Sequence, residues 1–251
     1  MFLLHTNFTD NYSSNSQKIR IMTEFWTWAN IFCPNCWENI IQYENNRPVA
    51  DFYCKKCRED YELKSGKNLS NKITAWAYST MINRINSNEN PNFLFLNYNS
   101  NYEVKNFFVI PKHYFIDKII EKRNPLKDTA RRAWRIWCNI LLSSIPESWK
   151  IFYIKDGITI EKNIIIKNWN KTLFLKEQTS TSKWWLLDIM ICIETLNKKE
   201  FCLQELYHFE EILKLKYPNN NFIKDKIRQQ LQILRNKWYL EFSNPWKYKI
   251  L

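Results

Sequence analysis

The sequence has 251 residues, of which 45% are hydrophobic, so the chain can bury one large core or two modest ones and is not a disordered tail. Lysine and arginine outnumber aspartate and glutamate by 37 to 25, and the formal net charge of +12 favours a polyanionic partner, nucleic acid first, over a small neutral ligand. Charge alone is equally compatible with surplus lysine that only keeps the protein in solution. No run approaches the ~18 consecutive apolar residues of a membrane span, and the first residues lack a signal peptide's layout, so we expect a cytoplasmic protein without a membrane partner.

The first 120 residues predict a βαβ-like core. Residues 17–28 carry apolar side chains at helical spacing and predict an amphipathic helix. Residues 73–85 predict a second helix, and short apolar runs predict buried strands at 49–53, 61–64, 93–98 and 107–110. An irregular basic stretch with Arg131, Arg132 and Arg135 follows, and we expect Arg131 and Arg132 to contact DNA. These patterns favour the α/β class.

A polar run at residues 178–182 separates a second part of different composition, so we divide the chain into domains 1–180 and 183–251. Helical patterns at 184–196, 203–215 and 222–236 precede two strand-like pieces at 238–242 and 247–251. Three helices followed by a two-stranded wing is the order of a winged helix-turn-helix domain, which typically binds DNA.

The third of these helices has the composition of a recognition helix. Its apolar positions Ile223, Ile227, Leu231 and Leu234 mark a buried side. The side chains expected on the opposite, exposed side are Lys224, Arg228, Gln229, Gln232 and Arg235. Glutamine suits adenine edges, and arginine suits guanine or phosphate, so this face suits a major groove. An ordinary solvated helix face is the alternative.

Four of the seven cysteines form a Cys-x2-Cys-x17-Cys-x2-Cys arrangement, which lies within the spacing of a zinc ribbon. The ligands would be Cys33, Cys36, Cys54 and Cys57. Four thiolates complete a tetrahedral zinc ion and leave no position for water, so we expect this zinc ribbon (residues 33–57) to hold structure. The other three, Cys138, Cys192 and Cys202, lie among apolar neighbours and are expected to be core residues.

The second cysteine pair is flanked by charged residues, with Asp51 before it and Glu62 and Lys64 after it. On a strand, Glu62 and Lys64 share a face while Leu63 points to the core. If Asp51 projects from a neighbouring strand, two carboxylates and an ammonium group converge. Such a trio suits phosphodiester hydrolysis, with one or two Mg²⁺ held by Asp51 and Glu62. By the pattern alone, ordinary charges on a solvated strand remain the better explanation.

Glycine is nearly absent, because the chain has 2 glycines and 12 tryptophans, whereas ordinary usage is roughly seven per cent glycine. Trp37, directly after the first cysteine pair, and Trp246, in an expected turn, stand where the backbone favours glycine. We hypothesise that UGA codons, read as glycine in some bacterial lineages, lie behind such tryptophans. UGG codons at these positions would contradict this. A lineage that reads UGA as tryptophan is the alternative, but it does not account for the missing glycines.

Beyond these motifs, the sequence closely resembles the DpnI-like methyl-directed restriction endonucleases, nearly end to end. The segments that carry the resemblance are 16–20, 33–36, 44–54, 62–64, 90–93, 129–133 and 226–235. A zinc ribbon interleaved with an Asp and a Glu-x-Lys pair, followed by a winged helix, is an unusual combination. The resemblance departs at glycine, because the family has glycine where this sequence has Trp37, Trp76, Trp134, Trp137 and Trp246. Residues 134–137 look like a base-reading loop of the family, so real tryptophans there would alter recognition.

The resemblance implies a PD-(D/E)xK nuclease core with a zinc-ribbon insert and a C-terminal winged helix. It implies a Mg²⁺-dependent type II endonuclease that cuts double-stranded DNA at GATC only when the adenine is N6-methylated. Separately from the resemblance, we expect a monomer, although the sequence leaves the oligomeric state open. Asp51, Glu62 and Lys64 would then be catalytic, and the four paired cysteines would bind zinc. The rival functions are a non-catalytic binder of methylated DNA and a zinc-ribbon regulator of transcription; the intact Asp51, Glu62 and Lys64 favour the enzyme.

Overall fold

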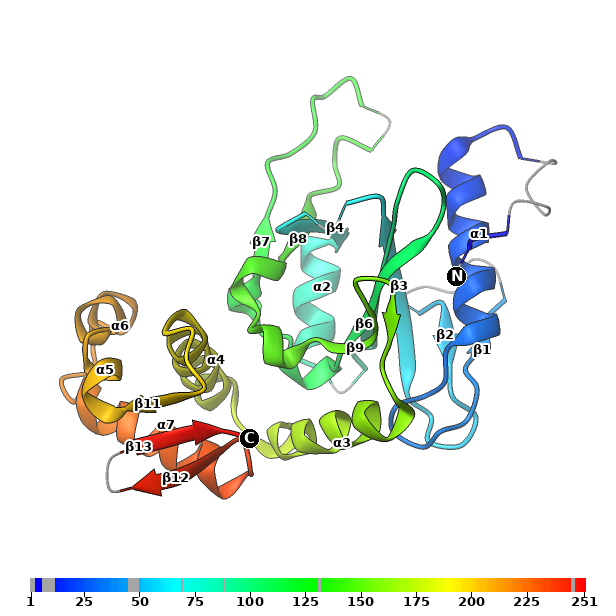
Figure 1. The fold of residues 1–251 in the computed structure, drawn as a ribbon. Helices are drawn as coiled ribbons and strands as arrows, with labels where there is room; N and C mark the ends of the chain where they lie inside the picture. Colours follow the sequence, from blue (N-terminus) through cyan, green and yellow to red (C-terminus); the bar gives the residue numbers. More distant parts are fainter. Residues whose placement is uncertain are drawn as a thin grey trace. The chain divides into compact units, whose positions relative to one another are not determined.

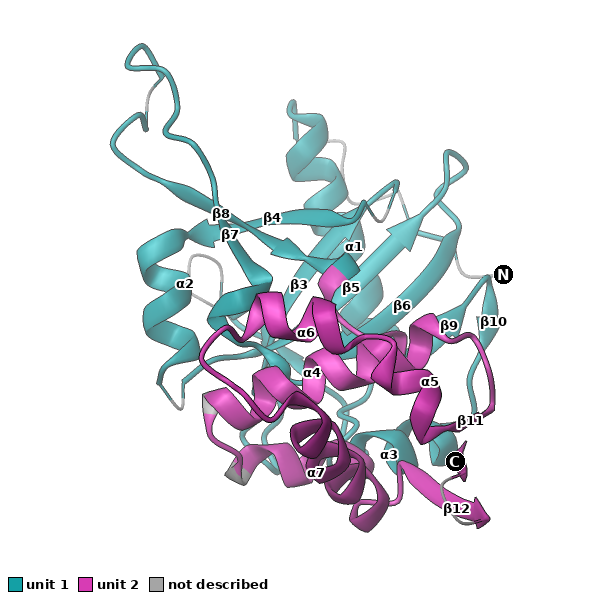
Figure 2. Cartoon of the chain, turned by 90° about the vertical axis from the view of Figure 1, so that its left-hand side faces the viewer, with its two compact units in different colours: residues 1–143, 148–170 teal, residues 144–147, 171–251 magenta. Residues whose placement is uncertain are grey.

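The computed structural model describes residues 3–5, 12–44, 50–68, 70–87, 89–130, 132–244 and 247–251. The chain forms two compact units, one of residues 1–143 and 148–170 and one of residues 144–147 and 171–251 (Figure 2). Within the described residues, no helix is long and apolar enough to cross a membrane.

The first unit is built on a seven-stranded sheet in the order β1-β2-β3-β5-β6-β9-β10 (Figure 1). Its strands are β1 (Ile41–Gln42), β2 (Phe52–Tyr53), β3 (Asp60–Gly66), β5 (Asn92–Tyr98), β6 (Val104–Ile110), β9 (Ile151–Lys155) and β10 (Ile158–Thr159). Neighbours pair antiparallel except β3 and β5, which run parallel, with Tyr61 opposite Asn92. The four predicted strands are therefore present, although the predicted run at 49–53 is a strand only over β2 and residues 45–49 lie outside the described part.

The parallel pair is joined by a crossover that contains β4 (Lys72–Ala77) and α2 (Tyr78–Ile85). The prediction of one helix over residues 73–85 is wrong in its first half. Residues Lys72 to Thr74 pair with Leu141 to Asn139 of β8 (Trp137–Leu141), and this long-range pairing overrides the local helical pattern. β4, β8 and β7 (Ile120–Lys122) form a second sheet, on which α2 packs.

The helix α1 (Asn15–Asn30) covers the predicted segment 17–28 and packs against β1 and β3. It buries Met22 and Trp26, and the Trp26 ring lies 5.5 Å from that of Phe107 in β6. The Thr23 hydroxyl lies 3.2 Å from that of Ser65, which fixes the helix against β3. The core of the unit is largely aromatic and contains Tyr61, Phe52, Phe93, Phe95 and Phe108.

The unit is completed by α3 (Lys162–Thr172) and short 3-10 turns. These turns are Lys112–Tyr114, Asp117–Ile119, Leu142–Ser144 and Glu147–Trp149, while a further 3-10 turn, Leu173–Glu177, lies in the second unit. The long connection between β7 and β8, residues 123–136, extends away from the sheet in both views (Figures 1 and 2). Its described residues form turns and irregular chain, as predicted for this basic stretch.

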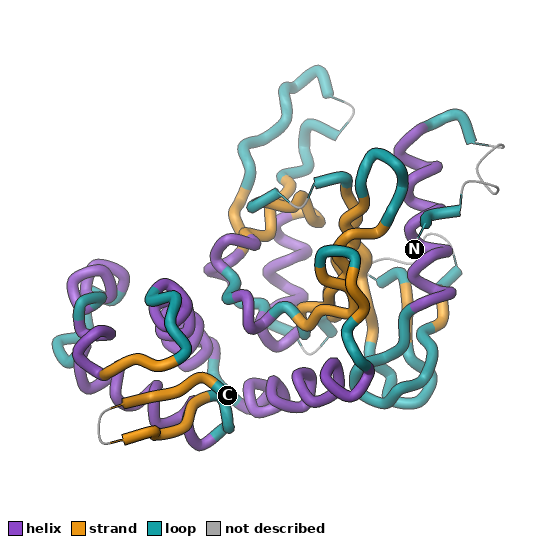
Figure 3. The backbone as a smooth tube through the Cα atoms, in the orientation of Figure 1, coloured by secondary structure: helices purple, strands orange, loops and turns teal. Residues whose placement is uncertain are grey.

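The second unit contains helices and a small sheet (Figure 3). Its elements are α4 (Ser180–Thr195), β11 (Glu200–Cys202), α5 (Leu203–Tyr207), α6 (Glu210–Lys216), α7 (Ile223–Asn236), β12 (Leu240–Asn244) and β13 (Lys247–Ile250). The predicted helix 203–215 is divided into α5 and α6. The two predicted strands form a hairpin, and β11, which was not predicted, pairs with β13 so that the sheet order is β11-β13-β12.

Among the described residues, two tryptophans have the left-handed backbone that favours glycine. Trp37, after the first cysteine pair, has φ of +73°, and Trp238, after α7, has φ of +61°. Both side chains are exposed, at 52% and 75% of their full accessibility, so neither contributes to a core. By contrast, Trp185 of α4 is buried and stacks on Tyr217. The geometry thus agrees with the glycine hypothesis at Trp37, while Trp246 lies outside the described residues.

We therefore expect Trp37→Gly and Trp238→Gly to leave the free energy of unfolding unchanged or to raise it by up to about 1 kcal/mol, because a left-handed L-residue costs roughly 1–2 kcal/mol and glycine's extra freedom roughly 0.5–1. The control Trp185→Gly should lower it by about 3–5 kcal/mol. Denaturant unfolding of the zinc-loaded proteins measures all three. A loss of several kcal/mol at Trp37 or Trp238 would show that these side chains stabilise the fold.

Candidate active site and metal centre

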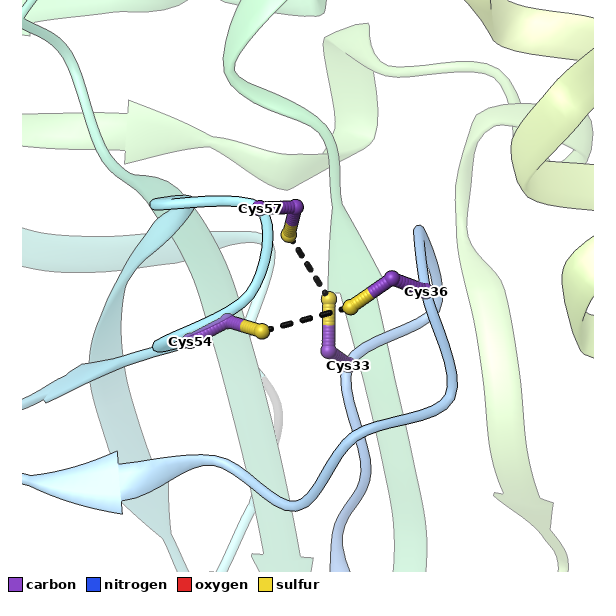
Figure 4. Close-up of side chains that lie close together, drawn as sticks. All are labelled: Cys33, Cys36, Cys54 and Cys57. Carbon is purple, nitrogen blue, oxygen red and sulfur yellow. Dashed lines mark hydrogen bonds between the residues drawn. The ribbon is translucent and has the colours of Figure 1, made fainter.

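The four paired cysteines meet at one point between two backbone knuckles (Figure 4). Their sulfur atoms all lie within 4.8 Å of one another, with Cys33 and Cys57 3.4 Å apart and Cys36 and Cys54 3.3 Å apart. The two knuckles fold alike, because the amide of Trp37 donates to the carbonyl of Cys33 and the amide of Arg58 donates to that of Cys54, each at 2.9 Å. Trp37 and Arg58 both have positive φ.

This arrangement fits a metal ion bound by four sulfurs. A tetrahedral zinc site with Zn–S bonds of about 2.3 Å places its sulfurs about 3.8 Å apart, close to the spacing found here. Burial raises the pKa of Cys36 to about 11 and raises that of Cys33 further. Thiolates at these positions therefore need a cation beside them. The four cysteines are also free of disulfide bonds.

Asp51 and Glu62 lie on the hairpin of β2 and β3 that begins at this cysteine cluster. The amide of Asp51 donates to the carbonyl of Tyr61, and the carboxylate Oδ2 of Asp51 accepts from the amide of Leu63 at 2.7 Å. The carboxylate is thus fixed against the backbone of β3, next to Glu62. Glu62 is itself only 8% exposed.

Lys64 lies beside Glu62, as the alternation of a strand predicts. Its Nζ lies 2.6 Å from Oε1 of Glu62, and the Nε1 of Trp76 donates to the same oxygen at 3.0 Å. Leu63 is half-buried rather than enclosed in the core, which corrects the prediction for that side chain. The hairpin therefore brings together the three side chains that the sequence singled out.

The carboxylate pair carries more negative charge than its surroundings offset. Burial and, next to it, the neighbouring charge of Glu62 raise the pKa of Asp51 to about 7, against the lowering effects of the Leu63 amide and of Lys64. A cation bound beside this carboxyl group would favour its ionised form and lower its pKa. Two close carboxylates with an unfavourable charge are typical of functional sites and suit a divalent metal with oxygen ligands.

Two further side chains of the site, Arg20 and Glu24, come from α1 and were not predicted. Glu24 is only 6% exposed; its Oε1 accepts from Nε of Arg20 at 2.5 Å, and its Oε2 accepts from Gln42 at 2.9 Å. A glutamate on an amphipathic helix is ordinary, so the sequence offers only one signal, an acidic residue on the helix's buried side.

The basic loop 123–136 presents part of the expected DNA-contacting set. Arg132 is exposed, whereas Arg131 lies outside the described residues. Arg135 is half-buried, with its guanidinium 5.2 Å from the ring centre of Trp137 and 5.9 Å from that of Trp134. Trp134 itself is 80% exposed.

On α7, the apolar positions Ile223, Ile227, Leu231 and Leu234 are buried as predicted. Lys224, Arg228, Gln229 and Gln232 are exposed, while Arg235 is half-buried and lies over the Phe242 ring of β12 at 4.6 Å. Several of these side chains have local partners: Lys224 pairs with Glu210, Arg228 pairs with Asp225, and Gln229 accepts from Lys226. The polar face is available to a ligand that can compete with these exposed contacts.

The first unit is thus a mixed α/β protein whose main sheet carries a cysteine cluster beside a carboxylate pair, and the second has the order of a helix-turn-helix domain with a wing. The family model described as DpnI, the Dam-replacing family, matches residues 1–178, and that of the Dam-replacing HTH domain matches residues 181–250. The chain belongs to the DpnI, or Dam-replacing, family. Membership indicates a methyl-dependent restriction endonuclease with a DNA-binding HTH domain.

Removal of the metal should unfold the cysteine cluster. We expect the purified protein to contain one zinc ion per chain and Cys54→Ser to lose it, because the remaining three sulfurs cannot complete the tetrahedron. The control Cys202→Ser, at a half-buried cysteine outside the cluster, should keep the zinc. Elemental analysis and thermal unfolding measure both. Full zinc content in Cys54→Ser would exclude the four-sulfur site.

The raised pKa of Asp51 predicts a pH-dependent stability. The folded protein holds this proton more tightly than the unfolded chain, so the contribution is complete below about pH 4 and is lost as the pH rises to about 7. Asp51→Asn keeps an oxygen for the Leu63 amide and has no charge. Without Mg²⁺, we expect the variant to melt several °C above the wild type at pH 8, where about 1 kcal/mol corresponds to roughly 2–4 °C, and level with it near pH 4. A wild type that melts at the same temperature as Asp51→Asn at pH 8 would contradict this.

Proposed function

We propose that the protein is a Mg²⁺-dependent endonuclease that cuts double-stranded DNA at GATC sites whose adenine carries an N6-methyl group. The observation that carries the proposal is the meeting of Asp51, Glu62 and Lys64 on one hairpin, in a member of the DpnI family. The net charge of +12 agrees with a polyanionic substrate.

The side chains divide the chemistry among them. Mg²⁺ bound to the carboxylates would neutralise charge on the phosphate and lower the pKa of a water molecule. Asp51 offers Oδ1, since Oδ2 is bonded to Leu63, and Glu62 projects from the adjacent strand. Lys64, whose ammonium is already beside Glu62, would orient the attacking water and stabilise the charge that develops on the phosphate.

We assign zinc to the four cysteines, with a structural role. Cys54 and Cys57 both lie in the connection between Tyr53 and Asp60, so the metal would fix the turn of the hairpin that carries Asp51 and Glu62. Four sulfur ligands leave no position for a water nucleophile. Four reduced thiols also agree with a reducing compartment, and we place the protein in the cytoplasm.

For DNA recognition we propose two surfaces, one on each unit. Arg131 and Arg132 of the loop 123–136 would contact DNA beside the cleavage site. On α7, the set Lys224, Arg228, Gln229, Gln232 and Arg235 would enter the major groove. An aromatic or guanidinium face suits a methylated base, because the methyl group adds apolar area that a flat group can cover. The half-buried Arg135 and its tryptophan neighbours offer such faces.

A methylated-DNA binder without nuclease activity is the rival function. Such a protein would have no use for a buried carboxylate pair, which destabilises the fold wherever both groups ionise. The raised pKa of Asp51 therefore favours the enzyme.

The test is digestion of one plasmid prepared in adenine-methylated and unmethylated forms. We expect Mg²⁺-dependent cutting of the methylated form only, and we expect Asp51→Ala to lower the cleavage rate at least about 1,000-fold because it removes a metal ligand. Binding of Asp51→Ala to a methylated duplex should remain, and its affinity should fall steeply with salt. Cutting by Asp51→Ala at the wild-type rate would exclude this metal site. Specific binding by a wild type that never cuts would favour the methylated-DNA binder without nuclease activity.

A further inference from the structure

The pair of Arg20 and Glu24 on α1 differs from an ordinary ion pair on a helix surface. Such pairs at i and i+4 normally join two exposed side chains and contribute little. Here the Glu24 side chain is only 7% exposed, while that of Arg20 is 56% exposed. Both oxygens of Glu24 are occupied, one by Nε of Arg20 and the other by Gln42 of β1. The buried Glu24 carboxylate therefore holds the inner side of the Arg20 guanidinium and leaves the Arg20 side chain largely exposed to solvent.

The bond from Arg20 uses Nε, which is the inner nitrogen of the guanidinium. Within the part of the chain that the structure describes, this is the one hydrogen bond of the Arg20 side chain, so the two Nη groups remain for another partner. These Nη groups form the planar fork that matches two oxygens of a phosphate. Lys64, the other cation of the site, is different because it is only 17% exposed and its ammonium lies on Glu62.

Arg20 also lies within the electric field of the carboxylate pair. The pKa of Arg20 is raised first by its hydrogen bond to Glu24, and the charges of Glu24, Asp51 and Glu62 raise it further. The packing of α1 on β1 and β3 accounts for this proximity. A solvent-exposed, permanently charged fork therefore stands at the edge of the two carboxylates proposed to bind Mg²⁺.

We propose that Arg20 contacts a backbone phosphate of the DNA at the cleavage site and that Glu24 is a positioning residue, which holds the guanidinium for that contact. The proposal rests on the proposed function and names a further substrate-binding residue for it. Glu24, Asp51 and Glu62 face two fixed cations, Arg20 and Lys64. A divalent ion would change the net charge of these five side chains from negative to positive. Arg20 would then face the anionic DNA backbone with its positive charge.

The alternative is a structural role, in which Arg20 only neutralises the buried Glu24. Two readouts separate these roles. A phosphate contact adds to the dependence of DNA affinity on salt, with a slope of about 0.9 per contact, whereas a structural pair does not. The second readout is the melting temperature, which falls when one member of a structural pair is removed. The double variant Arg20→Ala with Glu24→Gln removes the arginine without leaving a buried charge unpaired, so it separates loss of the contact from loss of stability.

The experiment compares Arg20→Ala, Arg20→Lys, Glu24→Gln and the double variant with a control, Lys18→Ala. The control removes one positive charge from a half-buried position on the same helix. Affinity for a duplex with one fully methylated GATC site is measured in Mg²⁺ over a range of KCl, with every protein in a Lys64→Ala background so that the DNA stays intact. Single-turnover cleavage is measured with the same variants in proteins that keep Lys64.

We expect Arg20→Ala and the double variant to lose about 0.9 from the slope of log K against log salt and to cut about 10- to 100-fold more slowly. Arg20→Lys should keep the slope but regain only part of the rate, because it keeps the charge and lacks the fork. Lys18→Ala should match the wild type in both. Glu24→Gln should keep the slope and cut about 10-fold more slowly, since the arginine is present but less well held.

An unchanged slope in the folded double variant, or an equal loss in Lys18→Ala, would overturn the assignment of Arg20. That result can be told from a failure of the proposed function, because the latter requires a wild type that does not cut methylated DNA. The binding slopes decide the role of Arg20 in either case.

Discussion

The pairing of β2 with β3 is the constraint on which the site depends. Its register, with Phe52 opposite Tyr61, fixes the backbone of Asp51 against Tyr61 and its carboxylate against Leu63. The same register turns Glu62 toward Asp51 from the adjoining strand. The strand β3 is in turn held in the sheet by its parallel pairing with β5, and the four cysteines close the far end of the hairpin. A slip of one residue would move Glu62 and Lys64 to the other face of the sheet.

A buried negative charge follows from this geometry. The fold places Asp51 and Glu62 where burial disfavours ionisation, and it supplies Lys64 on one side and the pair of Arg20 and Glu24 on the other. Stability and activity therefore oppose each other at this point. A divalent cation would reduce the repulsion between Asp51 and Glu62. In the proposed reaction, its positive charge would also allow the anionic phosphate to approach the site. Further positive charge lies on the loop 123–136 and on α7, and it can attract DNA.

Sequence patterns predicted those features that depend on short spacing. The Cys-x2-Cys pairs, the shared face of Glu62 and Lys64 and the apolar stripe of α7 each follow from geometry within a few residues. Features that depend on distant partners could not be predicted. The segment Lys72–Ala77 is a strand because β8, some sixty residues later, pairs with it. The role of Arg20 depends on Gln42 of another element. The left-handed backbone of Trp238 was not predicted, although the predicted helix 222–236 ends where α7 does, because tryptophan is not a residue that indicates such a backbone.

The central claim is that Asp51 and Glu62 together bind the metal that cleaves DNA. The most direct measurement is anomalous scattering from Mn²⁺, substituted for Mg²⁺, in crystals of the Lys64→Ala protein with a methylated GATC duplex. The account predicts a manganese peak within bonding distance of both carboxylates and of a phosphate oxygen of the DNA, and no such peak with Asp51→Asn. A DNA complex whose metal lies away from Asp51 and Glu62, or whose phosphate backbone does not approach them, would contradict it.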